Sequence, residues 1–244
     1  MIKTFIFLDL ETTGLITKNY MPKITEMSLI AVSRTAICDT TNISPRVLQK
    51  LVLPIHPNVP ISKDIQTLTG LSNENLKEFP CFNCDIYNLV LNFINRLAAP
   101  ACFIAYNGNN YDYPIFLSEF KNIEKNFSEN VLSIDMMHLV KEFFSCKQNP
   151  RKEMNIVQPI ASSSSCTEDR RGSNVRRQLD FTNSRPINFR LSSVYKHIFG
   201  NNPEDAHSAE GDCLTMIRCA IKLGNFFVEW TDCNAVPLTN YTSK

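Results

Sequence analysis

The chain begins with a run of large apolar residues that ends in two carboxylates. Residues 5–8 are all apolar, and Asp9 and Glu11 follow with one residue between them. Side chains alternate across a β-strand, so these carboxylates would share a face, about 7 Å apart along the chain. Carboxylates this close repel each other unless a cation lies between them, and a hard divalent cation is the usual solution. The stretch therefore predicts a buried strand that carries acids to a site, with a strand whose tip is simply solvated as the alternative.

The size of the chain allows one α/β domain with spare length for an insertion. It has 244 residues, of which 43% are hydrophobic and 20% charged, and its formal net charge is +1. These values are ordinary for a soluble globular protein, and they neither indicate nor exclude a nucleic-acid partner. Polar residues and prolines interrupt the longer apolar stretches, so we expect no membrane contact. The first strand leaves no room for a cleaved signal peptide.

The nine cysteines indicate a reducing compartment, because their number is odd and their spacing gives no regular disulfide framework. We therefore expect an intracellular protein, in the cytoplasm or the nucleus. Cys81 and Cys84 form one C-x-x-C, but no second pair or histidine follows at the spacing of a zinc site. Buried or half-exposed thiols are favoured there over a structural zinc ion.

Three strands are predicted before the first long helix. The second and third span residues 24–34 and 46–53, and the short connections suggest an antiparallel meander. Ser62 can cap a short helix that ends at Gly70 and has Ile65 and Leu68 on its inner face. Apolar residues recur every three or four positions over residues 85–97, which indicates an amphipathic helix. They are Ile86, Leu89, Val90, Phe93, Ile94 and Leu97.

A fourth strand at residues 102–106 precedes a third acid. The strand is followed by a loop rich in turn formers and then by a helix that begins near Asp112, with Pro114 in its first turn. This order places Asp112 at the carboxyl edge of a sheet, where ligands bind. The alternative is an acid that merely favours the helix dipole. A fifth strand is predicted at 131–134 and a helix at 136–144.

Residues 145–186 differ in kind from the rest, and we expect them to form a disordered basic insertion. They contain a serine run at 162–165 and two arginine pairs, Arg170-Arg171 and Arg176-Arg177. Residues 147–196 carry ten Lys or Arg and four Asp or Glu, an excess of six positive charges. The segment is either an electrostatic arm for phosphate backbones or a solvated linker.

The last candidate residues are His207 and Asp212. A helix at 189–199 ends at Gly200, and a second one passes through Leu214, Ile217 and Ile221. His207 and Asp212 stand five residues apart across the start of that second helix, so both can face one cavity. Four carboxylates and a histidine make a two-metal phosphodiesterase site plausible: cations roughly 4 Å apart clamp the attacking and leaving oxygens. Magnesium suits such a site, and a histidine can take the proton of the attacking water.

Three segments resemble the exonuclease motifs of the DEDDh superfamily and, within it, those of the three-prime repair exonucleases. They are Phe-Leu-Asp-Leu-Glu-Thr-Thr-Gly-Leu (7–15), Ala-Tyr-Asn-Gly-Asn-Asn-Tyr-Asp-Tyr-Pro (105–114) and His-Ser-Ala-Glu-Gly-Asp (207–212). Further similarity at 45–51, 68–72 and 191–195 extends the resemblance over nearly the whole chain except the insertion. A sister subclass has a tyrosine four residues before the last acid. Ser208 stands there in this chain, which favours the histidine type.

The resemblance implies an RNase H-like α/β fold, with a mixed central sheet flanked by helices in a single exonuclease domain (1–244). The implied activity is hydrolysis of DNA from a free 3′ end, preferably single-stranded, to nucleoside 5′-monophosphates, as in DNA degradation and repair. The implied ligands of two Mg²⁺ ions, with Mn²⁺ as a substitute, are Asp9, Glu11, Asp112 and Asp212, and the implied general base is His207.

The resemblance also implies a substrate-binding set and a partner. The backbone at Glu11 and Thr12 would hold the terminal 3′-hydroxyl, and Leu15 and Leu68 would wedge the terminal nucleotide. Tyr111 would contact the region of the scissile phosphate, where His207 also meets the substrate. A homodimer built through a sheet edge is implied as well.

Two departures and two alternatives accompany this resemblance. Tyr106 replaces the histidine usual before Asn-Gly, which puts any phosphate contact of that histidine in doubt, and Asn110 replaces an arginine seen in some members. An RNA-directed enzyme of the same superfamily is the first alternative, because discrimination depends on the 2′-hydroxyl. A non-catalytic nucleic-acid-binding protein is the second, although it would be expected to lose an acid or the histidine.

Overall fold

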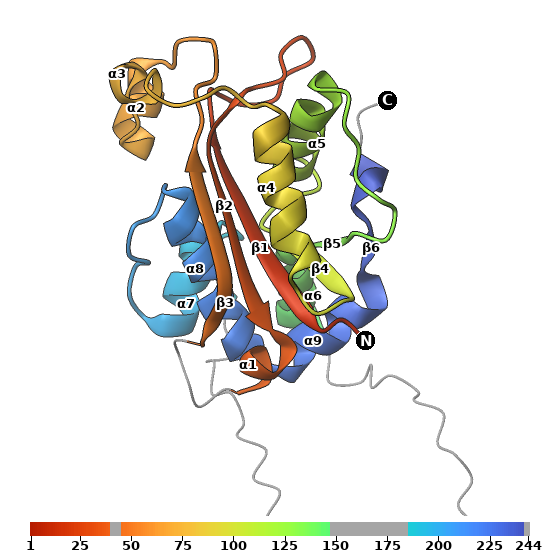
Figure 1. Cartoon of the computed structure of the whole chain (residues 1–244). Helices are drawn as coiled ribbons and strands as arrows, with labels where there is room; N and C mark the ends of the chain where they lie inside the picture. Colours follow the sequence, from red (N-terminus) through yellow and green to blue (C-terminus); the bar gives the residue numbers. More distant parts are fainter. Residues whose placement is uncertain (40–44, 147–184, 242–244) are drawn as a thin grey trace, which may run out of the picture.

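A six-stranded mixed sheet forms the centre of the computed structural model, which describes residues 1–39, 45–146 and 185–241 (Figure 1). The strand order is β3-β2-β1-β4-β5-β6. The pairs β1–β2, β2–β3 and β5–β6 are antiparallel, whereas β1–β4 and β4–β5 are parallel. The mixed sheet and its antiparallel meander are therefore confirmed. The strands are β1 (Thr4–Thr12), β2 (Ile24–Ser33), β3 (Val47–Pro54), β4 (Ala101–Ala105), β5 (Leu132–Asp135) and β6 (Val236–Pro237).

Helices lie on both faces of the sheet (Figure 1). The α4 and α5 helices pack on one face, with α6, α7, α8 and α9 on the other. The helices are α1 (Arg34–Cys38), α2 (Lys63–Thr69), α3 (Asn73–Leu76), α4 (Cys84–Asn95), α5 (Asp112–Asn122), α6 (Met136–Cys146), α7 (Leu191–Phe199), α8 (Ala209–Leu223), α9 (Asn225–Asn234) and the 3₁₀ turn η1 (Leu238–Tyr241).

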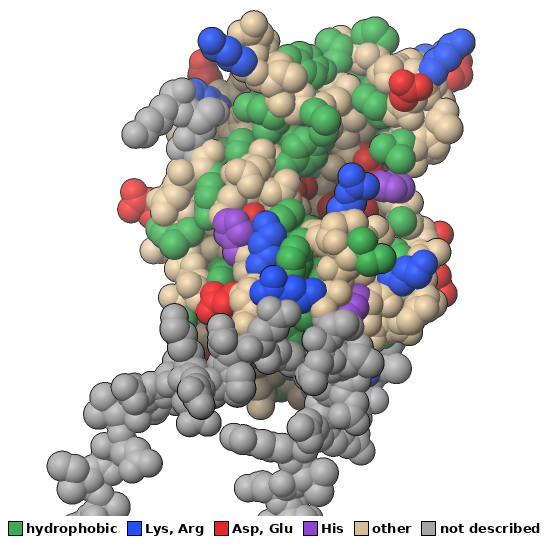
Figure 2. Space-filling model, turned by 180° about the vertical axis from the view of Figure 1, so that it is seen from behind, with side chains coloured by type: hydrophobic (Ala, Val, Ile, Leu, Met, Phe, Trp, Pro, Cys, Tyr) green, Lys and Arg blue, Asp and Glu red, His purple; other side chains and the backbone are tan. Residues whose placement is uncertain are grey.

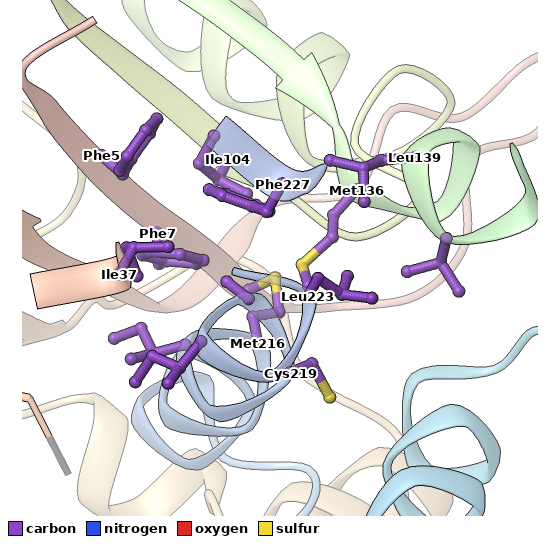
Figure 3. Close-up of a cluster of buried hydrophobic side chains, with 14 of the residues drawn as sticks. Phe5, Phe7, Ile37, Ile104, Met136, Leu139, Met216, Cys219, Leu223 and Phe227 are labelled. Carbon is purple, nitrogen blue, oxygen red and sulfur yellow. The ribbon is translucent and has the colours of Figure 1, made fainter. Parts of the chain in front are cut away.

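The alternation of β1 sends its side chains into two separate cores. Phe5 and Phe7 join Met216, Phe227 and other residues of α8 and α9 in one buried cluster (Figure 3). The even-numbered residues of β1 pack instead against α4 and α5. Asp9 and Glu11 have the parity of Phe5 and Phe7, so the strand presents both carboxylates to the face that α8 covers.

The short helix α2 forms where the sequence predicts it, but its predicted inner face is wrong. Ser62 accepts a hydrogen bond from the Ile65 N–H at the start of α2, and Gly70 ends it with a φ of 73°. None of its residues is buried, however, and 55% of Leu68 is exposed. The cap signals are local, whereas burial needs a neighbouring element, and α2 lies at the outer end of the sheet (Figure 1).

Two further expectations need correction. Leu89 of α4 is 45% exposed, because the buried stripe of this helix runs through Ile86, Val90 and Phe93 alone. The predicted insertion begins too early, since residues 145 and 146 belong to α6. The rest of it lies outside the described residues, apart from positions 185 and 186, and so do both arginine pairs.

Candidate active site

The centre of the candidate site is a group of three carboxylates from β1 and α8. Each of Asp9, Glu11 and Asp212 offers an oxygen that lies within 4.8 Å of the other two. The α8 helix packs across β1 and β2, and this packing brings Asp212 to two acids some two hundred positions away in the sequence. A view from behind Figure 1 shows acidic side chains in a recess, with basic and histidine side chains beside it (Figure 2). These three residues match the acids that the sequence singled out.

Asp112 is the first residue of α5 and is only 3% exposed. It lies outside the group of three, yet it interacts electrostatically with its members. Its negative charge raises the pKa of Asp9 and Glu11, and the charge of Asp212 raises its own pKa. The fourth predicted acid is therefore close enough to the other three for their negative charges to repel one another.

These carboxylates resist ionisation. Burial is the main reason that the pKa of Asp9 lies well above its usual range, and the charges of Asp112, Asp212 and Glu11 add to it. Burial, followed by the charges of Asp212 and Glu26, raises the pKa of Glu11 to about 8. The pKa of Asp112 also rises to about 8, chiefly through burial.

The site fits divalent cations. In the described ranges, none of the four carboxylates forms an ion pair with a lysine or arginine side chain. A cluster of oxygen donors whose negative charge is paired with no described lysine or arginine suits a hard metal ion, because the charge of the ion would stabilise the ionised carboxylates. This donor set holds oxygen alone, as magnesium and manganese prefer.

His207 lies just before α8 on a tightly folded segment. Its side chain is exposed, its φ is 68°, and its backbone N–H donates to Asp212 Oδ2 over 3.3 Å. Burial raises the pKa of Asp212, whereas the hydrogen bond and the nearby charge of His207 lower it. The structure thus brings the backbone of His207 to Asp212, one of the three grouped acids.

Gly211 is what lets this segment fold against the helix. A Cβ at this position would lie 2.1 Å from the carbonyl oxygen of Asp205, far inside any normal contact. The Ser208 hydroxyl caps α8 by accepting from the Gly211 N–H over 3.1 Å. The left-handed His207 and the close approach at Gly211 together set the course of the chain into α8.

The residues after β1 form a hydrogen-bonded corner with Tyr111. The hydroxyls of Thr12 and Tyr111 each lie 2.8 Å from the carbonyl oxygen of Gly14 and contact each other. The pKa of Tyr111 is raised to about 12, mainly by burial, so this side chain is a neutral phenol at ordinary pH. Tyr111 therefore ties the start of α5 to the end of β1.

Two of the predicted substrate-binding residues expose apolar surface near this corner. Leu15 is 74% exposed and Leu68 is 55% exposed. The segment after β1 and the α2 helix lie at the same end of the sheet, where β1 delivers its carboxylates (Figure 1). Each exposed leucine leaves apolar surface that a ligand could cover.

Tyr106, the departure from the family pattern, is committed to a structural contact. Its hydroxyl donates to the carbonyl oxygen of Phe189 over 2.9 Å, and its ring packs against the core on the α8 side. Burial raises the pKa of this phenol well above its usual range.

Sequence reasoning missed two acids that support the site. Asp135 is 2% exposed and accepts hydrogen bonds from the backbone N–H groups of Asn107, Asn109 and Met137. It thereby orders the loop between β4 and α5 that leads to Asp112. A carboxylate between a strand and a helix is a recognisable capping signal. The second missed acid is Glu26, the cross-strand partner of Glu11, which only the strand register reveals.

No helix in the described parts of the chain has both the length and the hydropathy that crossing a bilayer requires. Seven cysteines are free thiols: Cys38, Cys81, Cys84, Cys102, Cys213, Cys219 and Cys233. The C-x-x-C therefore holds no disulfide.

Comparison with known proteins places this site in a family. The sequence model of the exonuclease family, of the RNase T type, matches residues 6–149. The three-prime repair exonuclease 1 of Bos taurus is 29% identical over 250 residues, which cover 98% of this chain and 69% of the relative. The three prime repair exonuclease 2 of Mus musculus is 28% identical over 240 residues, which cover 94% and 87%.

Solved structures share the fold. The nuclease domain of 3′hExo, described as a DEDDh family member bound to rAMP, aligns with a TM-score of 0.61 at 10% identity over 91% of this chain and 92% of that one. Cell-death related nuclease 4 aligns with a TM-score of 0.60 at 13% identity, over 96% of this chain but only 65% of that one. These matches confirm the RNase H-like exonuclease fold. Because the family model covers more than half of the sequence, the chain belongs to the exonuclease family and is an enzyme related to the three-prime repair exonucleases.

Proposed function

We propose that this enzyme is a metal-dependent exonuclease that removes nucleoside 5′-monophosphates one at a time from the 3′ end of DNA, with single-stranded DNA preferred. The observation that carries the proposal is the group formed by Asp9, Glu11 and Asp212, whose oxygens lie within 4.8 Å of one another. The 3′-to-5′ direction and the DNA substrate rest on the relatives named three-prime repair exonucleases, whose sequences align with 94% or more of this chain.

The four carboxylates Asp9, Glu11, Asp112 and Asp212 would hold two Mg²⁺ ions, with Mn²⁺ as a substitute. When bound, such ions activate the attacking water and neutralise charge on the phosphate and the leaving oxygen. The protein contributes the placement of the ligands: Asp9 and Glu11 are fixed by a central strand, and Asp112 and Asp212 by two helix starts.

His207 would act as the general base. Its imidazole is exposed at the edge of the carboxylate group, and its backbone is tied to Asp212. A neutral imidazole can accept the proton of the attacking water and release it to solvent, because its unperturbed pKa is near neutrality. The exposure of the side chain supports this role, since the accepted proton has a direct exit.

The corner after β1 would receive the 3′-terminal nucleotide. The register shift between Glu11 and Thr12 interrupts the β1–β2 ladder, and such interruptions re-aim backbone groups next to active sites. These backbone groups would bind the 3′-hydroxyl, while the leucine side chains of Leu15 and Leu68 would wedge against the terminal base. Tyr111 and His207 would contact the substrate around the scissile phosphate.

The biological unit would be a homodimer of a single exonuclease domain, joined through the edge of the sheet. β3 is the outermost strand at one end of the sheet order, and half of its Leu48 side chain is exposed. An open strand edge of this kind is a ready site for pairing with a second strand. Light scattering that gives the mass of one chain would contradict this part of the proposal. The free thiols fit an intracellular location, in the cytoplasm or nucleus.

A digestion with labelled ends tests the activity. Single-stranded DNA labelled at its 5′ end should give a ladder of shortening products with Mg²⁺, and the same strand labelled at its 3′ end should release labelled mononucleotide from the start. Chelator and the Asp212→Asn variant should both abolish the reaction. Release of mononucleotide from the 5′ end instead would overturn the direction.

Matched RNA is the second substrate in the same experiment. Faster digestion of RNA than of DNA would replace DNA with RNA as the substrate class. Tight binding of either strand without any digestion would favour the non-catalytic alternative.

A further inference from the structure

Glu26 stands next to the carboxylate group without belonging to it. In the β1–β2 ladder it is the direct partner of Glu11, so the two side chains lie on the same face of the sheet. Its Oε2 is engaged elsewhere, because it accepts a hydrogen bond from the Ala209 N–H over 2.9 Å. Glu26 therefore reaches from the sheet to a helix 183 residues further along the chain.

The amide that Glu26 binds belongs to Ala209, which lies between His207 and Asp212 in the sequence. Ala209 is the first residue of α8, two positions after His207 and three before Asp212. The first N–H groups of a helix have no acceptor within the helix, and a carboxylate there is also favoured by the helix dipole. Glu26 thus caps α8 from a neighbouring strand.

Two other backbone donors around this start are satisfied from within the segment. The Ser208 hydroxyl accepts from Gly211, and Asp212 accepts from the N–H of His207. These two contacts hold the segment to α8, but neither ties α8 to the sheet. The bond between Glu26 and Ala209 ties the first residue of α8 to the sheet, and the Cys213 thiol, four residues further on, donates to the carbonyl oxygens of Phe7 and Ser28.

We propose that Glu26 is a positioning residue of the exonuclease site, which fixes the start of α8 so that Asp212 and His207 face the acids of β1. The proposal rests on the function proposed above. Glu26 acts through the backbone of Ala209 and is not one of the proposed metal ligands. Because β2 pairs directly with β1, any shift of α8 relative to β2 would be a shift of Asp212 relative to Glu11.

A second contact between α8 and the sheet offers a matched control. Glu210 pairs with Lys50 of β3 over 2.7 Å, but both side chains are substantially exposed. Exposed ion pairs of this type contribute about 0–1 kcal/mol. The Glu26 carboxylate, in contrast, meets a backbone donor that is partly buried. Loss of the Glu210 contact should therefore leave the start of α8 in place.

Hydrogen exchange on the metal-free protein tests the tie without relying on activity. In Glu26→Ala, amides of residues 207–212 should exchange faster than in the wild type, while those of β1 keep their protection. Glu26→Gln retains a carbonyl acceptor of the same length and should keep most of the protection. Glu210→Gln should exchange like the wild type.

Turnover on single-stranded DNA gives the second readout. The kcat of Glu26→Ala should fall about tenfold to a hundredfold, the scale of a misplaced catalytic group, with a KM for DNA near the wild-type value. The kcat of Glu26→Gln should stay within about threefold of the wild type. Equal kcat losses in the Ala and Gln variants would overturn the proposal, as would unchanged exchange at 207–212 in Glu26→Ala.

Ala209→Pro removes the same bond from the other side and covers the case in which Glu26→Ala does not fold. Proline suits the first position of a helix, and Ser208 before it already has the extended backbone that a following proline requires. This variant should lower kcat as Glu26→Ala does, and wild-type turnover in it would overturn the proposal. If the wild-type enzyme itself leaves DNA intact, the function proposed above fails, whereas the exchange experiment still decides the role of Glu26.

Discussion

The two sides of the active site are built in opposite ways. Asp9 and Glu11 belong to a strand that is paired on both sides, and the residues before them lie in the buried core. His207 is exposed, has a left-handed backbone, and is tied to the site through its own N–H and Asp212. The comparison teaches that Asp9 and Glu11 are fixed by the sheet. His207, the proposed base, is held instead by the segment at the start of α8, where its side chain is open to solvent.

Removing one of the proposed metal ligands should have the largest effect. Asp212→Asn keeps the size of the side chain but removes a ligand charge, so we expect DNA digestion to fall to background while the fold is retained. Turnover under saturating Mg²⁺ measures the first effect and circular dichroism the second. Substantial turnover in this variant would remove Asp212 from the ligand set.

Removing the proposed base, His207, should have the next largest effect. His207→Ala should lower kcat by about a hundredfold or more, the usual contribution of a positioned general base. Because the side chain is exposed, its loss should cost little stability. A thermal melt beside the kinetic assay checks both statements, and near-normal kcat would contradict the assigned role.

Displacing the segment that carries the base should have a smaller effect. In Gly211→Ala the new Cβ would meet the carbonyl oxygen of Asp205, so the segment at 205–208 must move. We expect kcat to fall about tenfold, since a small misplacement of the base is costly. Stability should fall by about 1–3 kcal/mol, the usual cost of overpacking.

Gly200→Ala is the control for this variant. Gly200, unlike Gly211, has a positive φ, of 82°, and its Cβ would find no atom within 4 Å. The variant should lose stability through backbone strain and keep its kcat. Equal kcat losses in the two variants would mean that instability, and not displacement of His207, causes the defect.

The smallest effect concerns pH and stability without metal. The pKa values of Glu11 and Asp112 are both raised to about 8 in the folded protein, so the folded state binds protons more tightly than the unfolded chain. Their contribution to stability is therefore complete in acid and is lost as the pH rises toward 8. We expect the chelated protein to melt at least about 2 °C higher near pH 5.5 than near pH 8. Glu11→Gln or added Mg²⁺ should reduce this difference. A melting temperature that rises with pH in chelator would contradict the raised pKa values of Glu11 and Asp112.

Local signals in the sequence predicted much of this architecture. Ser62, Gly70 and Gly200 mark helix ends by capping chemistry that involves only near neighbours, and each is found as predicted. The alternation of β1 correctly placed Asp9 and Glu11 on one face. The four acids and His207 could be singled out because each lies in a short motif of distinctive composition.

What the sequence could not show depends on contacts between distant segments. Leu68 fits an amphipathic pattern, but none of the described elements covers it, so it is exposed. Glu26 lies in an apolar strand with no motif around it, and its partner Ala209 is visible only once α8 is packed on the sheet. The position of Asp135 before α6 is a capping signal that the sequence offers. Its second role, ordering the loop between β4 and α5, depends on contacts with Asn107 and Asn109 that only the folded sheet brings about.

Binding of Mn²⁺ tests the central claim most directly, because it separates the proposed metal ligand Asp212 from the proposed base His207. Free Mn²⁺ can be followed by electron paramagnetic resonance in the wild type, Asp212→Asn and His207→Ala, without any substrate. We predict that His207→Ala binds Mn²⁺ as the wild type does although it digests DNA poorly, and that Asp212→Asn binds it much more weakly. Equal binding by all three proteins, or weakened binding in His207→Ala alone, would contradict the account.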